Sequence, residues 1–366
     1  MTTNVHMEIA DGIRVSRKKL NAIYNDTAKS AALANLVYVS DNQDGISRVG
    51  KTGAFSYRFK NRAVKDKKTL QRIKSLVLPP AWQNVWICSQ ENGHLQATGL
   101  DARGRKQYRY HAHWNSLRNE TKFHHLYEFG KVLPDIRTRL QKDIKLPGLP
   151  QEKVLAAIIS VMQCTCIRIG NSQYEKLYGS FGLTTLKDKH VDIHGAAVKF
   201  TFTGKKGVHH DIDLKNKRLA TIIQQCKEIP GKELFQYYDD AGQRHAVDSG
   251  MVNDYIKGIS GGQFTAKDFR TWAGTLHAIE AFRSIGTADT ATGLKKNVVA
   301  ALDDVAKQLG NTRTVCKKYY VHPKVISLYE DGGLSKYLPV SGTATCDAET
   351  DLSAEEQVLM KILLAA

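Results

Sequence analysis

The spacing of apolar residues along the chain changes near residue 118. Before it, short runs alternate apolar and polar side chains and are separated by Gly, Asn-Gly and Pro-Pro. They are LVYVS at 36–40, FSYRF at 55–59, VWIC at 85–88, HLQAT at 94–98 and RKQYRYH at 105–111. Alternation broken by turn residues predicts a small antiparallel sheet. One helix, KKTLQRIKSL at 67–76, interrupts the predicted sheet and ends before a Pro-Pro pair.

After residue 118 the apolar residues recur at helical spacing. Three segments show it most clearly: 124–144, 150–170 and 296–310. One hairpin interrupts them, AVKFTFTGKKGVHHDIDL at 197–214, in which Val198, Phe200 and Phe202 alternate with polar residues and GKKG is expected to form the turn.

These patterns predict an α+β protein. We expect a β-rich N-terminal domain at 1–117, which opens on a polar arm of about 30 residues, and a mostly α-helical domain with a hairpin at 118–340. A tail at 341–366 should carry a terminal helix, because Ser353 and Glu356 fit a capping box.

Composition agrees with a globular chain of two domains. The chain has 366 residues, of which 42% are hydrophobic and 24% charged. No stretch approaches the roughly 18 continuous apolar residues that span a bilayer, and the N-terminus lacks the apolar core of a signal peptide. We therefore expect a cytoplasmic, nucleoid-associated protein.

The net charge points to a polyanionic partner. The chain carries +17, the acidic tail from residue 341 carries −4, and the first 340 residues carry +21. So basic a body favours nucleic acid as the partner, although solubility alone could also account for the charge.

Two short motifs match known ligand sites without the required context. GISRVGKT at 45–52 fits the pattern GxxxxGK[ST], but a phosphate-binding loop must lead from a strand directly into a helix, and here a strand-like run follows. HHDID at 209–213 lacks a second acidic cluster to complete a metal site. The six cysteines form no CxxC pair. We predict no metal and no cofactor.

The stretch VCKKYYVHPK at 315–324 places Tyr319 and Tyr320 together in a basic setting. A tyrosine phenol can attack a DNA phosphate and retain the bond energy in a phosphotyrosyl ester, so religation needs no ATP. This chemistry requires cations around the phosphoryl oxygens and a proton donor for the leaving 5′-oxygen. The stretch alone is equally compatible with ordinary aromatic packing.

Four further residues occupy informative positions. Arg168 follows an apolar helix, and Lys205 lies at the hairpin tip. Arg270 is expected to project away from the apolar face of its helix, and Asn311 follows Gly310, a predicted helix C-cap. Each also has an ordinary structural interpretation, as a helix-terminal charge, a turn lysine, a surface charge or a cap.

Taken together, five segments resemble type IB DNA topoisomerases in the small form found in poxviruses and bacteria. They are TGLDARGRKQYRYHAHW at 98–114, IRIGNSQYEK with FGLTTLKDKHV at 167–191, FTGKKGVHH at 202–210, KDFRTWAGT at 267–275 and LGNTRTVCKKYYVHP at 309–323. The resemblance extends over about residues 36–330. It implies the catalytic fold of that family and a monomer that clamps duplex DNA and relaxes supercoils without ATP or metal.

The resemblance also implies roles for individual residues. Tyr320 is the expected nucleophile, which forms a 3′-phosphotyrosyl intermediate, and Tyr319 stands where the family has a small residue. Arg168 and Arg270 are expected to hold the non-bridging oxygens of the scissile phosphate. Lys205 is the expected general acid for the 5′-oxygen.

Asn311 stands where poxvirus enzymes have histidine and the bacterial branch has asparagine. It can donate a hydrogen bond to a phosphate oxygen but cannot carry a proton. Two departures from the family pattern, Arg313 in place of proline and Lys317 in place of arginine, remove no catalytic group.

The strand at 105–111 is expected, by the same resemblance, to lie against the major groove. The residues expected to contact DNA are Arg105, Lys106, Gln107, Tyr108, Tyr110, Tyr174 and Lys267. Tyrosines that merely pack on a half-buried strand are the alternative.

A tyrosine recombinase and a non-catalytic DNA-binding protein are the two alternatives to a topoisomerase. A tyrosine recombinase shares closely related catalytic residues but usually has histidine three positions before the second arginine, where this chain has Lys267. A non-catalytic DNA-binding protein is disfavoured because all five expected catalytic positions are filled.

Overall fold

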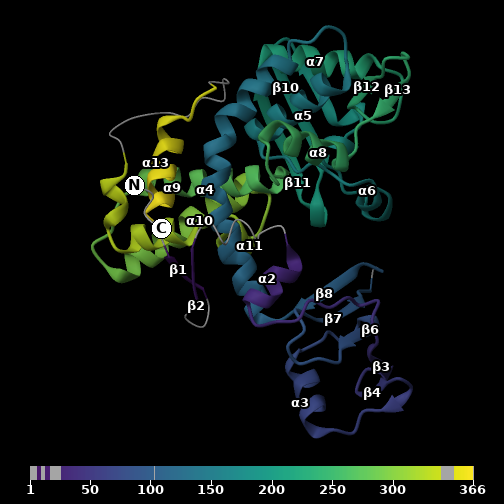
Figure 1. Cartoon of the computed structure of the whole chain (residues 1–366). Coiled ribbons are helices and arrows are strands. Elements are labelled where there is room, and N and C mark those ends of the chain that lie inside the picture. The colour runs from purple at the N-terminus through teal and green to yellow at the C-terminus, as the bar shows by residue number, and fades with distance from the viewer. Residues whose placement is uncertain (1–5, 10–12, 17–25, 103, 339–349, 366) are drawn as a thin grey trace. The chain divides into compact units, whose positions relative to one another are not determined.

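The computed structural model describes residues 6–9, 13–16, 26–102, 104–338 and 350–365 (Figure 1). The chain divides into two compact units, residues 1–125 and 126–366. No helix of the described residues is long and apolar enough to cross a membrane.

The first unit is built on a six-stranded antiparallel sheet with the strand order β5-β4-β3-β6-β7-β8. Its strands are β3 (Gly45–Lys51), β4 (Ala54–Phe59), β5 (Arg62–Ala63), β6 (Gln83–Cys88), β7 (Leu95–Leu100) and β8 (Lys106–Tyr110). Helix α3 (Lys67–Ser75) buries Ile73 in a small core with Ile46 and Ile87 of the sheet. The runs between residues 55 and 111 thus form the predicted sheet.

The GISRVGKT segment is not a phosphate-binding loop. Its residues form strand β3, which pairs with β4 on one side and β6 on the other. A phosphate-binding loop must lead directly into a helix, whereas β3 leads through a tight turn into β4, with which it pairs.

One prediction for the region before the sheet was wrong, and the hairpin and helix in this region were not predicted. The expected polar arm contains a hairpin of β1 (His6–Ile9) and β2 (Ile13–Ser16) and a helix, α2 (Thr27–Leu33), capped by Asp26. LVYVS does not join the sheet, and only Val37 forms an isolated bridge, with Gly93. Leu36 and Val39, three residues apart, are each buried in a small apolar cluster, while Val37 and Tyr38 between them are exposed.

The second unit is mostly helical. Its helices are α4 (Ala112–Asp143), α5 (Gln151–Thr165), α6 (Ser172–Tyr178), α7 (Lys217–Glu228), α8 (Ser249–Ser260), α9 (Ala266–Ile285), α10 (Ala291–Leu309), α11 (Arg313–Tyr319), α12 (Pro323–Glu330) and α13 (Ala354–Leu364). Short 3₁₀ turns occur at Leu183–Thr185, Asp188–His190, Lys205–Gly207 and Gly333–Lys336. Helix α4 begins in the first unit, twelve residues before the segment in which helical spacing was clearest, at 124.

The predicted hairpin is present. Strands β10 (Ala197–Thr203) and β11 (His209–Lys215) pair antiparallel, and β9 (Val191–His194) adds a third strand beside β10. A second small hairpin joins β12 (Gln236–Tyr238) to β13 (Arg244–Ala246). The inward residues of β10 enter the main core, in which α5 and α9 contribute long runs of buried side chains.

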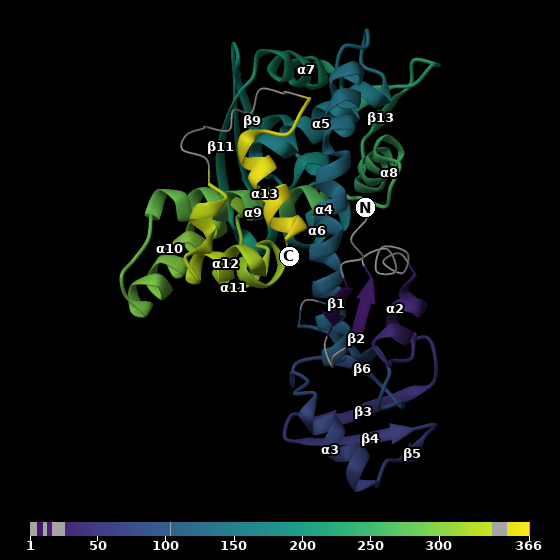
Figure 2. The same cartoon turned by 60° about the vertical axis from the view of Figure 1, so that its left-hand side comes forward.

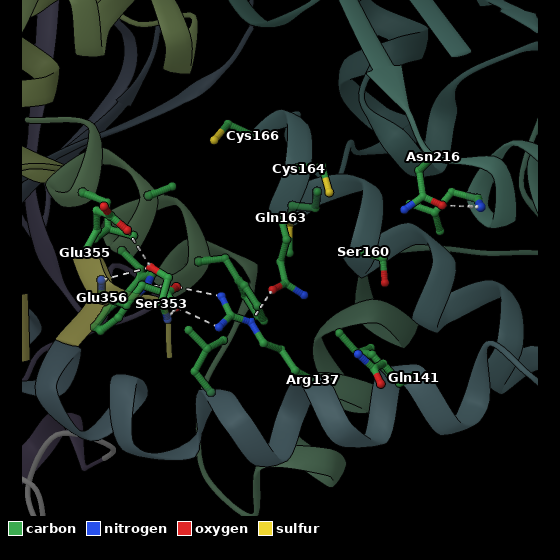
Figure 3. A pocket seen from close by; sticks show the side chains of 18 of the residues that line it. Arg137, Gln141, Ser160, Gln163, Cys164, Cys166, Asn216, Ser353, Glu355 and Glu356 are labelled. Carbon is green, nitrogen blue, oxygen red and sulfur yellow. Dashed lines mark hydrogen bonds and ion pairs between the residues drawn. The ribbon is translucent and has the colours of Figure 1, made fainter. Parts of the chain in front are cut away.

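The C-terminal helix α13 lies beside α9 (Figures 1 and 2). The predicted capping box is present, with the Glu356 amide donating to Ser353 Oγ at 3.2 Å and the Ser353 amide to Glu356 Oε2 at 2.9 Å. Glu356 also accepts two hydrogen bonds from Arg137 of α4, on the wall of a cavity of about 1120 Å³ (Figure 3). Residues 339–349 of the tail lie outside the described residues.

Candidate active site

Arg168 is held against the end of α10. The chain leaves α5 through Cys166, whose backbone is left-handed (φ 54°), and Arg168 follows two residues later. Its Nη2 donates to the Gly310 carbonyl at 3.1 Å and to Asn311 Oδ1 at 2.5 Å. The side chain therefore reaches from the end of one helix to the end of another.

Arg270 is buried, with only 5% of its surface exposed, so it is not a surface charge. Its Nη1 donates to the Cys166 carbonyl, and its Nη2 donates to the Leu309 carbonyl at 2.8 Å. These carbonyls lie at the C-termini of α5 and α10, where helices leave acceptors without intrahelical partners. The negative ends of two helix dipoles thus help offset the cost of burying the guanidinium.

Asn311 is placed by the turn that ends α10. Gly310 is the predicted C-cap, in the left-handed conformation (φ 57°), and the Asn311 amide donates to the Ala306 carbonyl at 2.9 Å. Because Asn311 Oδ1 accepts from Arg168, its Nδ2 is directed elsewhere. This Nδ2 is buried and has no hydrogen-bond partner among the described residues.

The electrostatics of this cluster favour an anion. The pKa of Arg168 falls to about 10 because of burial and the nearby charge of Arg270, while Tyr320 and Cys316 act in the opposite direction. The hydrogen bonds of both guanidiniums within the described chain go to carbonyl and amide oxygens, not to carboxylates. Arg270 Nε, like Asn311 Nδ2, is a buried donor for which the described part of the chain offers no acceptor. Phosphate oxygens accept hydrogen bonds from such donors.

Tyr320 lies against this pair. The guanidinium carbon of Arg270 is 5.3 Å from the centroid of its ring. The backbone amide of Tyr320 donates to the Cys316 carbonyl at 2.9 Å, and the Thr275 hydroxyl donates to the Tyr320 carbonyl oxygen at 3.2 Å. A methyl group on Gly274 would lie 2.8 Å from that same oxygen, so α9 approaches the Tyr320 backbone very closely. The backbone that carries the phenol is therefore fixed.

Tyr319 has a different environment. It is 36% exposed, and the ammonium of Lys318 lies 5.4 Å from its ring centroid. The structure thus brings together four of the five expected catalytic residues, Arg168, Arg270, Asn311 and Tyr320, and separates Tyr319 from them in its contacts.

Lys205, the fifth, lies where predicted, at the hairpin tip. Its ammonium is 5.5 Å from the ring centroid of Tyr174, which is itself exposed on α6. Lys267, in the first turn of α9, is exposed to solvent.

One residue near the arginines was not predicted. His210 was considered only as a metal ligand, yet it pairs with Phe202 on the inward face of the hairpin. Burial, followed by the charges of Arg168 and Arg270, lowers its pKa. The alternation of side chains along the hairpin predicts that His210 faces inward, but only when the length of the turn is known. Asp211 of the same motif pairs with Lys199 at 3.0 Å, and the described residues contain no group of three potential metal ligands.

The β8 strand of the first unit presents aromatic and basic side chains. Lys106, Tyr108 and Tyr110 share a face as expected: the two tyrosine rings stack with centroids 5.9 Å apart, and the Lys106 ammonium lies 5.6 Å from the Tyr108 centroid. On the other side, Asp101 accepts from Arg105 Nε at 2.6 Å and from Gln107 Nε2 at 3.0 Å.

Comparisons with known proteins give consistent descriptions for both units. Residues 111–336 match the family model of the eukaryotic DNA topoisomerase I catalytic core, and residues 54–101 match that of the bacterial DNA topoisomerase IB N-terminal domain. DNA topoisomerase 1B of Acanthamoeba polyphaga mimivirus is 32% identical over 282 residues, which cover 75% of this chain and 84% of that protein. DNA topoisomerase 1B of Vaccinia virus (strain Copenhagen) is 24% identical over 251 residues, covering 68% and 76%.

Proposed function

Since the chain belongs to the type IB DNA topoisomerase family, we propose that it relaxes supercoiled duplex DNA by cutting and rejoining one strand through Tyr320. The observation that carries the proposal is the cluster in which Tyr320 adjoins Arg270, interacts electrostatically with Arg168, and lies near two buried donors for which the described residues supply no acceptor. A phosphodiester placed there supplies the missing acceptors.

In the proposed reaction, Tyr320 Oη attacks phosphorus and the bond from phosphorus to O5′ breaks. The phenol proton passes to water, and the Lys205 ammonium gives a proton to the departing O5′. Religation is the reverse, with the 5′-hydroxyl displacing the tyrosine. No net bond energy is lost, so no nucleotide is consumed.

Charge on the phosphoryl oxygens grows in the transition state, and donors fixed in advance stabilise it best. Arg168 and Arg270 meet this requirement because backbone carbonyls at helix ends hold both of them. Asn311 adds a neutral donor. Its contribution should be smaller than that of either arginine.

DNA recognition is proposed to involve β8 of the first unit. Its stacked tyrosines and the adjacent Lys106 offer apolar and cationic contacts, while Asp101 orients Arg105 and Gln107 in advance. We further propose that Tyr174 and Lys267 contact the DNA backbone near the cut and that the protein acts as a monomer in the nucleoid.

A plasmid assay tests the proposal. Supercoiled plasmid is incubated with the protein and EDTA, without ATP, and we expect stepwise relaxation by the wild type and by Tyr319→Phe but none by Tyr320→Phe. Mass spectrometry of the adduct trapped with denaturant should then identify a Tyr320 peptide linked to a 3′-phosphate. Relaxation by Tyr320→Phe, with loss in Tyr319→Phe, contradicts the assignment. Reaction only on plasmids with paired recognition sites indicates a recombinase instead.

A further inference from the structure

The imidazole of His210 fills the space between two glycines. Its ring stacks on Phe202 with centroids 4.9 Å apart. A methyl group on Gly204 would lie 2.7 Å from Nε2, and one on Gly310 would lie 2.5 Å from Cε1. The ring therefore touches the hairpin on one side and the end of α10 on the other, and neither glycine has room for a side chain.

Both glycines directly precede proposed site residues. Gly204 is followed by Lys205, and Gly310 is followed by Asn311. The imidazole thus contacts both the base of the hairpin and the turn that holds Asn311, whose Gly310 carbonyl accepts from Arg168.

Burial and the charges around the ring disfavour its protonation. Arg168 and Arg270 face it from the helix ends, and His209 is its neighbour on β11; burial, together with these groups, lowers the pKa of His210. Arginine or lysine at this position would add a third buried cation beside the two guanidiniums, at a large desolvation cost. An imidazole fills the space without a permanent charge.

The proposed catalytic groups differ in how they are anchored. Both arginines and Tyr320 are tied to helix ends by hydrogen bonds. Lys205 instead lies in an exposed loop, next to Lys206, whose backbone is left-handed (φ 66°). The loop joins β10 to β11, and the pair formed by Phe202 and His210 lies near the end of the two strands from which the loop starts.

We propose that His210 is a positioning residue for the general acid: its ring, wedged between Gly204 and Gly310, holds the hairpin tip so that Lys205 reaches the leaving 5′-oxygen. This inference rests on the proposed function, in which Lys205 donates that proton. Loss of the ring lets the tip shift, while the two arginines and Tyr320 keep their anchors.

A pair of substrates separates positioning of the acid from general damage. One is a duplex oligonucleotide with the ordinary 5′-oxygen at the scissile bond, and the other has sulfur in that position. A thiol has a pKa of about 8.5, so a thiolate leaves without a proton donor. Single-turnover cleavage of both substrates is measured for the wild type, Lys205→Ala, His210→Ala and His209→Ala. His209 is the matched control, because it is exposed on the adjacent position of the same strand.

With the oxygen substrate, Lys205→Ala should lose about 10²-fold or more in rate, as expected for a missing general acid. His210→Ala should lose between about 10- and 100-fold, the effect of misplacing a group by about 1 Å. With the sulfur substrate both variants should return to within about threefold of the wild type, and His209→Ala should match the wild type on both substrates.

The outcomes distinguish the two proposals. Normal cleavage of the oxygen substrate by His210→Ala, or an equal loss on both substrates, overturns the role of His210. Failure of sulfur to restore Lys205→Ala overturns the assignment of Lys205 and hence the proposed mechanism. DNA binding and thermal unfolding are measured for every variant; if His210→Ala does not fold, His210→Asn, whose shorter planar group falls short of the wedge, replaces it with the same expected pattern.

Discussion

Within the second unit, Glu356 links the C-terminal helix α13 to α4 and α9, and its removal should destabilise that unit. The residue is 4% exposed, and its carboxylate accepts from Arg137 Nη1 (2.8 Å) and Nη2 (2.7 Å), Trp272 Nε1 (2.9 Å) and the Ser353 amide (2.9 Å). Trp272 lies two residues beyond Arg270 on α9. Glu356→Ala therefore removes a buried polar contact between α13 and the helix that carries a proposed catalytic arginine.

The expected loss of unfolding free energy follows from Arg137, whose charge loses its carboxylate partner. Breaking a buried ion pair from one side costs about 3–5 kcal/mol. Arg137 keeps its bond to the Asp351 carbonyl at 2.9 Å and is partly exposed, so the lower end, about 3 kcal/mol, applies. At about 2–4 °C per kcal/mol for a unit of this size, the midpoint of thermal unfolding should fall by roughly 6–12 °C.

Calorimetry of the full chain measures this shift, with Gln357→Ala as the control because that residue is exposed on the same helix. The control should stay within about 0.5 kcal/mol of the wild type. A variant Glu356→Ala that unfolds at the wild-type temperature refutes the reasoning, since it shows that the carboxylate contributes no net stability.

The pH dependence provides a second test. Burial raises the pKa of Glu356, but the hydrogen bond and charge of Arg137 more than offset it, so the pKa is lowered overall. A carboxyl group with a lowered folded-state pKa stabilises the protein above its unfolded pKa, about 4.3, and this contribution is lost as the pH falls through the folded value. The stability deficit of Glu356→Gln should therefore be largest near pH 7 and shrink below pH 4. A deficit that is the same at pH 7 and pH 3 contradicts the ionic role.

Four further predictions concern the site and the DNA. Arg270→Lys should slow single-turnover cleavage by about 10²–10³-fold, because lysine lacks the fork that binds two carbonyls and a phosphate at once; a loss below threefold contradicts its role. Asn311→Asp should cleave more slowly than Asn311→Ala in the same assay, since a carboxylate repels the phosphate, and the reverse order refutes direct contact. Gly310→Ala should destabilise the protein by at least about 1–2 kcal/mol in urea unfolding, from the left-handed backbone alone. DNA affinity, measured by fluorescence anisotropy, should fall steeply between 50 and 200 mM salt, by about 10³-fold or more if six or more phosphates are contacted.

The sequence predicted the features that depend on interactions between residues close together in the chain. The alternation of residues 55–59 and 197–203 produced strands, Gly310 produced a left-handed cap, and Ser353 with Glu356 produced a capping box. In each case the residues that fix the conformation are neighbours in the chain, so propensity and spacing suffice.

The burial of Arg270 could not be predicted in this way. A helical periodicity argument assumes one apolar face and one solvent face. Helix α9 instead lies among other helices, and its buried positions include neighbouring residues, from Asp268 to Trp272, rather than one stripe. The carbonyls that make room for the guanidinium come from residues about 40 and 100 positions away. Only the tertiary arrangement supplies them.

The hairpin shows how a single residue in a turn decides which side chain enters the site. A turn made of GKKG alone would pair Thr203 with Val208 and would place His209 opposite Phe202. The observed loop also includes Val208, whose carbonyl accepts from the Gly204 amide at 2.7 Å, so Thr203 pairs with His209 and Phe202 with His210. Because side chains alternate between the two faces of a strand, this one-residue difference exchanges the two histidines. An inserted or deleted residue in the loop should therefore turn His210 away from Gly310 and produce the same cleavage defect, restored by sulfur, as His210→Ala.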